Sequence, residues 1–261
     1  MAAILLWPGA VAIGLSLGLL GSGGSILTVP VLRYLVGQDE KVAIAGSLAI
    51  VGIIALVGSY SYVKARLVDW RTVALFGVPG MAGTYAGAWA SAYVSGLLQL
   101  SVFDVVMAVA GYFLLKPMAL NDQAGPNAAP RRREFRRVGS DGLVVGAVTG
   151  FVGVGGGFLI VPALVLLGGL PMIGAVATSL VISALKSAVG FFKYQEVLAV
   201  QGLQLDYTVI ASISLLGVIG SFAGAQLAQG LAKEKLQLAF GVLLIVMGLY
   251  IFSTSLPSLL A

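Results

Sequence analysis

Long apolar stretches separated by short polar segments run along the whole chain. A helix of about 20 residues crosses the roughly 30 Å hydrocarbon core of a bilayer, and six of the apolar stretches have about this length. The pattern therefore predicts an all-α polytopic membrane protein. The eight stretches are residues 4–36, 42–63, 72–93, 97–115, 140–169, 172–193, 207–230 and 236–256.

The first and fifth stretches, 4–36 and 140–169, are too long for one simple span. Each contains a glycine cluster followed by a proline, and both residue types interrupt helices. We expect a glycine-broken or re-entrant first segment in each half, followed by three transmembrane helices. Two readings fit the length: a hairpin with arms of about 15 residues, roughly 22 Å each, or a single span with an unwound middle.

An internal repeat relates the two halves of the chain. Residues 18–30, GLLGSGGSILTVP, match residues 150–162, GFVGVGGGFLIVP, at an offset of 132. A duplicated half with a broken hydrophobic segment in each copy is typical of secondary transporters. At the same offset, residues 45–48 match 177–180 and Tyr62 matches Tyr194. At an offset of 137, residues 69–70 match 206–207, and Gly80, Gly83 and Gly87 match Gly217, Gly220 and Gly224.

The connector between the halves is polar and carries RRREFRR at 131–137. Because basic loops stay on the cytoplasmic side, we predict a first half at 1–118, a basic cytoplasmic linker at 119–139 and a second half at 140–261. The start of the chain lacks a basic n-region and a cleavage site, so we expect its first apolar stretch to be retained.

Basic residues also predict that the two halves are inverted relative to each other. In the first half they precede the third apolar stretch, whereas in the second half most of them follow the corresponding stretch. If the first and fifth stretches are both hairpins, eleven lysines and arginines are cytoplasmic and three are outside, with Lys186 counted as intramembrane. The three are Arg33, Lys41 and Lys193.

Composition agrees with a membrane protein and excludes several kinds of chemistry. Hydrophobic residues make up 59% of the chain and charged residues 10%, compared with roughly 25% charged in soluble domains. The sequence has no cysteine and no histidine, which argues against thiol or Ser–His catalysis and against a metal site. Since the net charge of +5 lies in short loops and no Walker A motif is present, we expect no nucleic acid, no cofactor and no enzyme activity.

The glycine clusters are the first candidate binding elements. A helix that breaks inside a bilayer must face a cavity or protein, and the N-terminus of the helix that follows can hold an anion. The alternative is close helix packing through glycine, which we favour for the glycine rows at 80–87 and 217–224. The cluster residues proposed to bind substrate are Ser22, Gly23, Gly24, Ser25, Gly155, Gly156 and Gly157.

Lys186 is the second candidate, because a charge in mid-membrane costs about 3 kcal/mol or more. It shares one helical face with Ser179, Ser183 and Gly190. The alternative, a lysine that reaches the interface, would have to cover roughly 10 Å. Its repeat counterpart is Ile54. Hydroxyl groups for the same site are expected from Ser47, Thr178, Ser179 and Ser183.

Asp104 is a candidate coupling residue inside the fourth stretch. It could pair with Lys186 or Arg33, or carry a proton; the alternative is an interfacial carboxylate that reaches water. Aromatic side chains are expected to anchor the protein at the membrane surface. These are Trp7, Trp70 and Trp89.

Together these features resemble the sulfite exporter TauE/SafE family of membrane permeases. The resemblance rests on the twin G-x-G-G-x-x-x-x-x-P element at 21–30 and 153–162, on ATSL at 177–180 with its variant AGSL at 45–48, and on the basic loop that ends LVDW at 67–70. It covers nearly the whole chain except 116–139. It implies transport of sulfite or a small organosulfur anion across the cell (inner) membrane without ATP.

The sequence thus predicts a secondary transporter in the lipid bilayer, with the site between its halves. An anion channel and a transporter of another small anion stay open as alternatives, and so does homo-oligomer formation. An intramembrane enzyme is disfavoured, because no segment carries a pair of carboxylates.

Overall fold

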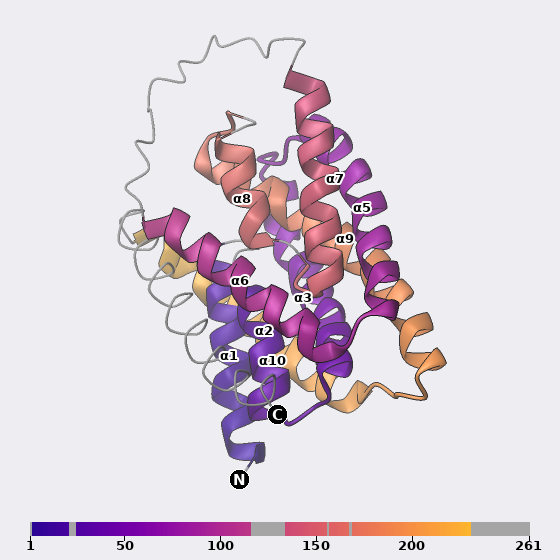
Figure 1. Cartoon of the computed structure of the whole chain (residues 1–261). Coiled ribbons are helices and arrows are strands. Elements are labelled where there is room, and N and C mark those ends of the chain that lie inside the picture. Colours follow the sequence, from indigo (N-terminus) through magenta and orange to yellow (C-terminus); the bar gives the residue numbers. More distant parts are fainter. Residues whose placement is uncertain (1, 21–24, 116–133, 156, 167–168, 231–261) are drawn as a thin grey trace.

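The computed structural model describes residues 2–20, 25–115, 134–155, 157–166 and 169–230, and every regular element in these ranges is a helix (Figure 1). Three of the helices are long and apolar enough to span a membrane, at Glu40–Lys64, Ile173–Val200 and Tyr207–Leu227. The all-helical architecture is therefore confirmed, and these apolar helices are consistent with a membrane protein. The predicted eighth segment, 236–256, lies outside the described residues. The helices are α1 (Ala2–Leu20), α2 (Thr28–Pro30), η2 (Val31–Leu35), α3 (Glu40–Lys64), α4 (Trp70–Thr72), η3 (Val73–Gly77), α5 (Val78–Ala90), η4 (Ser91–Tyr93), α6 (Gly96–Leu115), α7 (Glu134–Val152), α8 (Gly157–Leu166), α9 (Met172–Val200) and α10 (Tyr207–Gly230).

The first apolar stretch folds back on itself as a hairpin. A methyl group at Gly9 of α1 would lie 3.1 Å from Cγ1 of Val31 and 3.3 Å from Cδ1 of Leu35. These contacts require the 25–35 arm to run back along α1. In the second half, α7 and α8 form a similar pair, and Ile160 and Leu164 of α8 share a hydrophobic cluster with Val138 and Val145 of α7.

Helices from opposite halves pack closely through glycine. A methyl group at Gly14 of α1 would collide with the carbonyl oxygen of Gly217 in α10, and one at Gly146 of α7 would collide with that of Gly80 in α5. These two contacts are equivalent under the sequence repeat. Because backbones approach this closely only at small residues, the packing role predicted for the glycine rows is confirmed. The remaining glycines of the rows, Gly83, Gly87, Gly220 and Gly224, also face backbone atoms of the opposite half.

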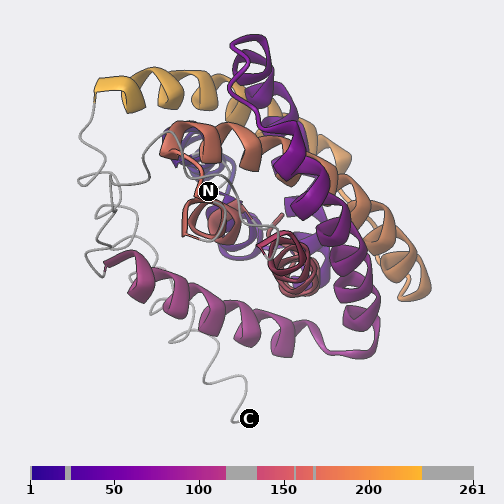
Figure 2. The ribbon, with the colours of Figure 1, turned by 90° about the horizontal axis from the view of Figure 1, so that it is seen from above.

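At the centre of the bundle, α3 crosses α9. A methyl group at Gly52 would lie 3.2 Å from Cβ of Ser187, and one at Gly190 would lie 3.2 Å from Cδ1 of Leu48. The residue number falls along α3 as it rises along α9, so these two helices run in opposite directions. Viewed from above, α6 lies along one edge of the bundle and α10 near the opposite edge (Figure 2).

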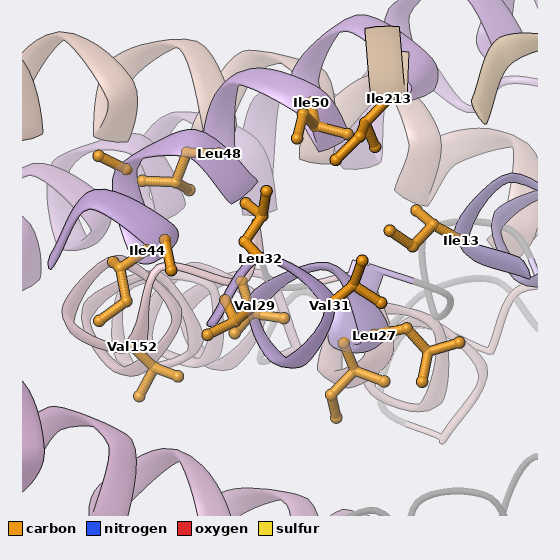
Figure 3. Packing of buried hydrophobic residues seen from close by; sticks show 14 of the residues in the cluster. Ile13, Leu27, Val29, Val31, Leu32, Ile44, Leu48, Ile50, Val152 and Ile213 are labelled. Atoms are coloured by element: carbon orange, nitrogen blue, oxygen red, sulfur yellow. The ribbon is translucent and has the colours of Figure 1, made fainter. Parts of the chain in front are cut away.

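The hydrophobic core joins side chains from both halves (Figure 3). Ile13 of α1, Leu32 of η2 and Ile44 of α3 meet Val152 of α7 and Ile213 of α10, all nearly or fully buried. In the part of the chain that the structure describes, the two halves therefore share this core.

Two features depart from the regular pattern of the sequence. Helix α7 begins at Glu134. Residues 134–139, which were predicted as the end of the linker, therefore form the first turns of this helix. In the third segment a π-helical turn, η3, comes just before Pro79. Proline has no N–H group to continue the helical hydrogen bonds, and its ring crowds the carbonyl group four residues earlier, which here is inside η3. The equivalent residue in the second half is Leu216, inside the continuous helix α10.

Candidate functional site

Lys186 lies halfway along α9 and is fully buried. Its Nζ atom has no hydrogen-bond partner among the described residues. A methyl group at Gly80 of α5 would lie 3.3 Å from its Cδ atom and 3.7 Å from its Cε atom. The aliphatic part of the side chain therefore packs on α5, and the ammonium group stays inside the protein instead of reaching the interface.

Two serines on the same face of α9 are also buried without a partner. The hydroxyl groups of Ser183 and Ser187 make no hydrogen bond within the described part of the chain, although both residues are 0% exposed. A buried polar group that lacks a partner costs about 1–3 kcal/mol. Such groups are therefore expected where a ligand completes the hydrogen bonding.

The break between α7 and α8 lies against this face. Gly153 and Gly155 have positive φ angles of 75° and 65°, a conformation that strongly favours glycine. A methyl group at Gly155 would lie 2.6 Å from Oγ of Ser187 and 2.9 Å from Cγ1 of Val51. The backbone thus approaches α3 and α9 at their crossing. Gly156 lies outside the described residues, and Gly157 is the first residue of α8.

Ser47 of α3 holds this break in place. Its hydroxyl group donates a hydrogen bond to the carbonyl oxygen of Gly153 and is 2.8 Å from that of Ile44. The sequence predicts this hydroxyl for the substrate site, and in the structure it bonds to two backbone carbonyl groups.

Two further α9 hydroxyl groups predicted for the site, those of Thr178 and Ser179, also form hydrogen bonds with backbone groups. Oγ1 of Thr178 accepts a hydrogen bond of 3.0 Å from the N–H group of Asp69, and Ser179 donates one of 2.8 Å to the carbonyl oxygen of Val176. The Asp69 side chain in turn accepts from the N–H group of Arg71 and the hydroxyl of Thr72. Thr178 therefore anchors the loop before α4.

In the first half, Ser22, Gly23 and Gly24 lie outside the described residues. Ser25 is fully buried, and its hydroxyl group has no partner among the described residues. The same is true of Thr28, one turn later, which sequence reasoning missed. Its place just before Pro30 in the repeated motif was the available signal.

Asp104 is 4% exposed, and neither carboxylate oxygen has a hydrogen-bond partner in the described ranges. The pairing with Arg33 is not formed, because Arg33 lies 2.5 Å from Glu40 and donates to the carbonyl of Gln38. No ion pair with Lys186 is formed within the described part either. The low exposure also argues against a carboxylate that reaches water.

A buried polar cluster that the sequence did not predict lies at the end of α7. Tyr194 of α9 and Gln99 of α6 both donate to the carbonyl oxygen of Phe151, at 2.7 and 2.6 Å. The repeat match between Tyr62 and Tyr194 was the one signal in the sequence. Among the described residues, no group of three or more acidic side chains could hold a metal ion.

Comparison with known proteins identifies the family. The family model described as Sulfite exporter TauE/SafE matches residues 6–251. A Xylella fastidiosa protein named probable membrane transporter protein is 32% identical over 256 residues, which are 95% of this chain and 94% of that protein. The probable membrane transporter protein YunE of Bacillus subtilis is 31% identical over 69% of this chain and 75% of its own length.

A more distant relative, the probable membrane transporter protein MJ0441 of Methanocaldococcus jannaschii, is 22% identical over 95% of this chain and 96% of its own length. No solved structure matches the chain. The family match covers both repeated halves and the connector between them. The chain therefore belongs to the sulfite exporter TauE/SafE family and is a membrane transporter.

Proposed function

We propose that this transporter carries sulfite, or a small organosulfur anion such as a sulfonate, through a site at the crossing of α3 and α9. One observation carries the proposal: Lys186, Ser183 and Ser187 are fully buried on one face of α9, and none of their polar atoms has a partner in the described structure. The family description supports the choice of substrate.

The chemistry of the site complements an oxyanion. Lys186 supplies a positive charge and three N–H donors, and Ser183 and Ser187 each supply one O–H donor. Hydrogen bonds between a cation and an oxyanion are about twice as strong as neutral ones. The break before α8 approaches Ser187, and the N-terminus of a helix adds a favourable dipole for an anion. Ser25 and the glycines at 23–24 and 156–157 complete the proposed site.

The arrangement of the helices supports alternating access between inverted halves. The antiparallel crossing of α3 and α9 and the exchange of partners between α1–α10 and α5–α7 are what inverted repeats would give. The site would then lie between the halves near the bilayer midplane, in the cell (inner) membrane. Asp104 is the proposed coupling residue, because it is a buried carboxylate with no partner among the described residues.

The test is anion binding by the purified transporter. A ligand that binds the folded protein raises its unfolding temperature, so sulfite, sulfate, thiosulfate and ethanesulfonate are compared at equal ionic strength. We expect sulfite or ethanesulfonate to stabilise the wild type and to have no effect on Lys186→Met. Stabilisation by sulfate alone would contradict the substrate assignment. Single-channel currents in planar bilayers would favour a channel.

A further inference from the structure

The carbonyl groups at the end of α7 need hydrogen-bond donors from other helices. The last carbonyls of a helix have no partner within it, and leaving them unpaired inside a membrane is costly. The carbonyl oxygen of Phe151 accepts from the Tyr194 hydroxyl at 2.7 Å and from Nε2 of Gln99 at 2.6 Å. Nε2 of Gln99 is also 2.8 Å from the Tyr194 oxygen.

We name this arrangement the carbonyl clamp: Gln99, Tyr194 and the carbonyl group of Phe151. Both side chains are fully buried. They come from α6 and α9, so the clamp ties three helices to one point of the backbone. Two converging donors fix the direction of a carbonyl group more tightly than one donor does, because each donor occupies a different lone pair of the oxygen.

The position of the clamp along the chain links it to the candidate site. Phe151 comes two residues before Gly153, where φ becomes positive, and four before Gly155, where an added methyl group would meet Ser187. The orientation of the last helical turn sets the direction in which the chain leaves the helix. A change at Phe151 would therefore move the break relative to Ser187 and α3.

We infer that Gln99 and Tyr194 are positioning residues, which hold the break between α7 and α8 in the geometry that faces Ser187. This inference rests on the proposed function for its effect on anion binding. The end of α7 itself has further supports: the N–H groups of Gly153 and Val154 lie 2.8 and 3.3 Å from the carbonyl oxygen of Thr149, and Ser47 holds Gly153. Loss of the clamp should therefore loosen the break without unfolding the helix.

The experiment measures hydrogen exchange at the break and sulfite affinity at the binding site as two separate quantities. Tyr194→Phe and Gln99→Met each remove one donor and keep the buried side chain close to its original size. In each variant we expect faster hydrogen exchange of the amides at 152–158 and about fivefold weaker sulfite binding, as for loss of one hydrogen bond. The double variant leaves the carbonyl with neither donor, so its affinity should fall by more than the product of the two single effects.

Met107→Ala is the matched control, because Met107 is a fully buried residue of α6 outside the clamp. It should lower the unfolding temperature while leaving sulfite affinity and exchange at 152–158 as in the wild type. Wild-type exchange in all three clamp variants would overturn the inference. Faster exchange with unchanged sulfite affinity would make the clamp a stabilising contact only. If the wild type binds no sulfite, the substrate assignment fails, and hydrogen exchange alone decides whether the clamp holds the break.

Discussion

Lys186 and Ile54 occupy equivalent positions in the two halves, and each packs against a glycine of a neighbouring helix. Lys186 lies on Gly80 of α5, and Ile54 lies on Gly217 of α10. The four residues are related by the offsets of the sequence repeat. One position of the repeat therefore carries a buried lysine and its counterpart a buried apolar side chain, so an anion site here would be asymmetric.

Replacing Lys186 with isoleucine, the residue of the other half, should remove anion binding without loss of stability. An unpaired buried charge is costly, and exchange for an apolar side chain is often neutral or stabilising. Loss of a charge-assisted contact worth roughly 1.5–3 kcal/mol should weaken sulfite binding at least tenfold. Affinity and unfolding temperature are measured together, with Ile54→Val as the control. Wild-type affinity in a folded Lys186→Ile variant would remove Lys186 from the site.

Gly155→Ala should impair transport more than Gly37→Ala does. Both glycines have positive φ angles, of 65° and 80°, so both substitutions strain the backbone. Only at Gly155 would the added methyl group also meet Ser187 and Val51; at Gly37 nothing lies within 4 Å. Uptake into proteoliposomes is compared at equal amounts of folded protein. Equal losses in the two variants would mean that backbone strain, and not contact with the site, limits transport.

Gly24→Leu and Gly156→Leu are expected to block transport, because both glycines belong to the repeated clusters proposed to bind the substrate; both lie outside the described residues. Gly83→Leu should instead prevent folding, because its first side-chain atom would collide with the carbonyl oxygen of Leu143. Gel filtration separates the two effects: the first two variants should elute as the wild type does, and the third as aggregate. A monodisperse Gly83→Leu protein would contradict the close packing of α5 on α7.

The helix boundaries were largely predictable from the sequence, because the bilayer requires about 20 apolar residues for each span. The stretch predicted at 42–63 corresponds to α3, Glu40–Lys64, and the stretch predicted at 207–230 has the same bounds as α10. The partners of these helices were not predictable in the same way. Glycine spacing shows that a helix is closely approached, but it does not show by which helix, so the pairing of α1 with α10 needed the structure.

The candidate site was predictable only in part, because a single sequence shows local helical spacing but not contacts between distant residues. Lys186 and Ser183 follow from helical spacing, which is local. Ser47 and Gly153 are 106 residues apart in the sequence, and Gln99 and Phe151 are 52 apart. Nothing in a single sequence shows that such residues meet. Polar side chains that satisfy the backbone therefore looked the same as those free to bind a ligand.

A disulfide between α3 and α9 should stop transport by preventing movement of these two helices relative to each other. Cβ positions at Gly52 and Ser187 lie 3.2 Å apart, close to the roughly 3.5–4.5 Å of natural disulfides, and the chain has no other cysteine. We expect oxidation of the Gly52→Cys, Ser187→Cys double variant to stop uptake and reduction to restore part of it. Ser187→Cys alone, treated with the same oxidant, is the control. Full uptake by the crosslinked protein would show that this crossing does not move.

Asp104→Asn should uncouple transport from the proton gradient. A carboxylate with no partner in a membrane interior is stabilised by taking up a proton, and asparagine cannot carry that proton across. We expect sulfite accumulation against its gradient to be lost while downhill exchange continues. Asp141→Asn, a change of a carboxylate near the start of α7, should leave both activities intact. Accumulation at the wild-type rate in Asp104→Asn would remove Asp104 from the coupling.

The last prediction concerns sidedness: the two halves are inverted, and each hairpin opens on one face of the membrane. The loop at 64–71 and the segment 116–137, which runs into the start of α7, carry nine of the fifteen lysines and arginines and should be cytoplasmic. Helix α3 then begins outside, and the first hairpin opens there. Helix α9 runs opposite to α3 and therefore begins in the cytoplasm, where the second hairpin opens.

Single cysteines at Ala2, Gln38 and Ser258 test this arrangement, since the chain has no cysteine of its own. In intact cells, a membrane-impermeant maleimide should label all three positions. A cysteine at Arg66, in the basic loop before α4, should react only after the cells are permeabilised. Labelling at Gln38 together with protection at both Ala2 and Ser258 would mean parallel halves. The antiparallel crossing of α3 and α9 would then need another explanation, because parallel halves would carry these two equivalent helices through the membrane in the same direction.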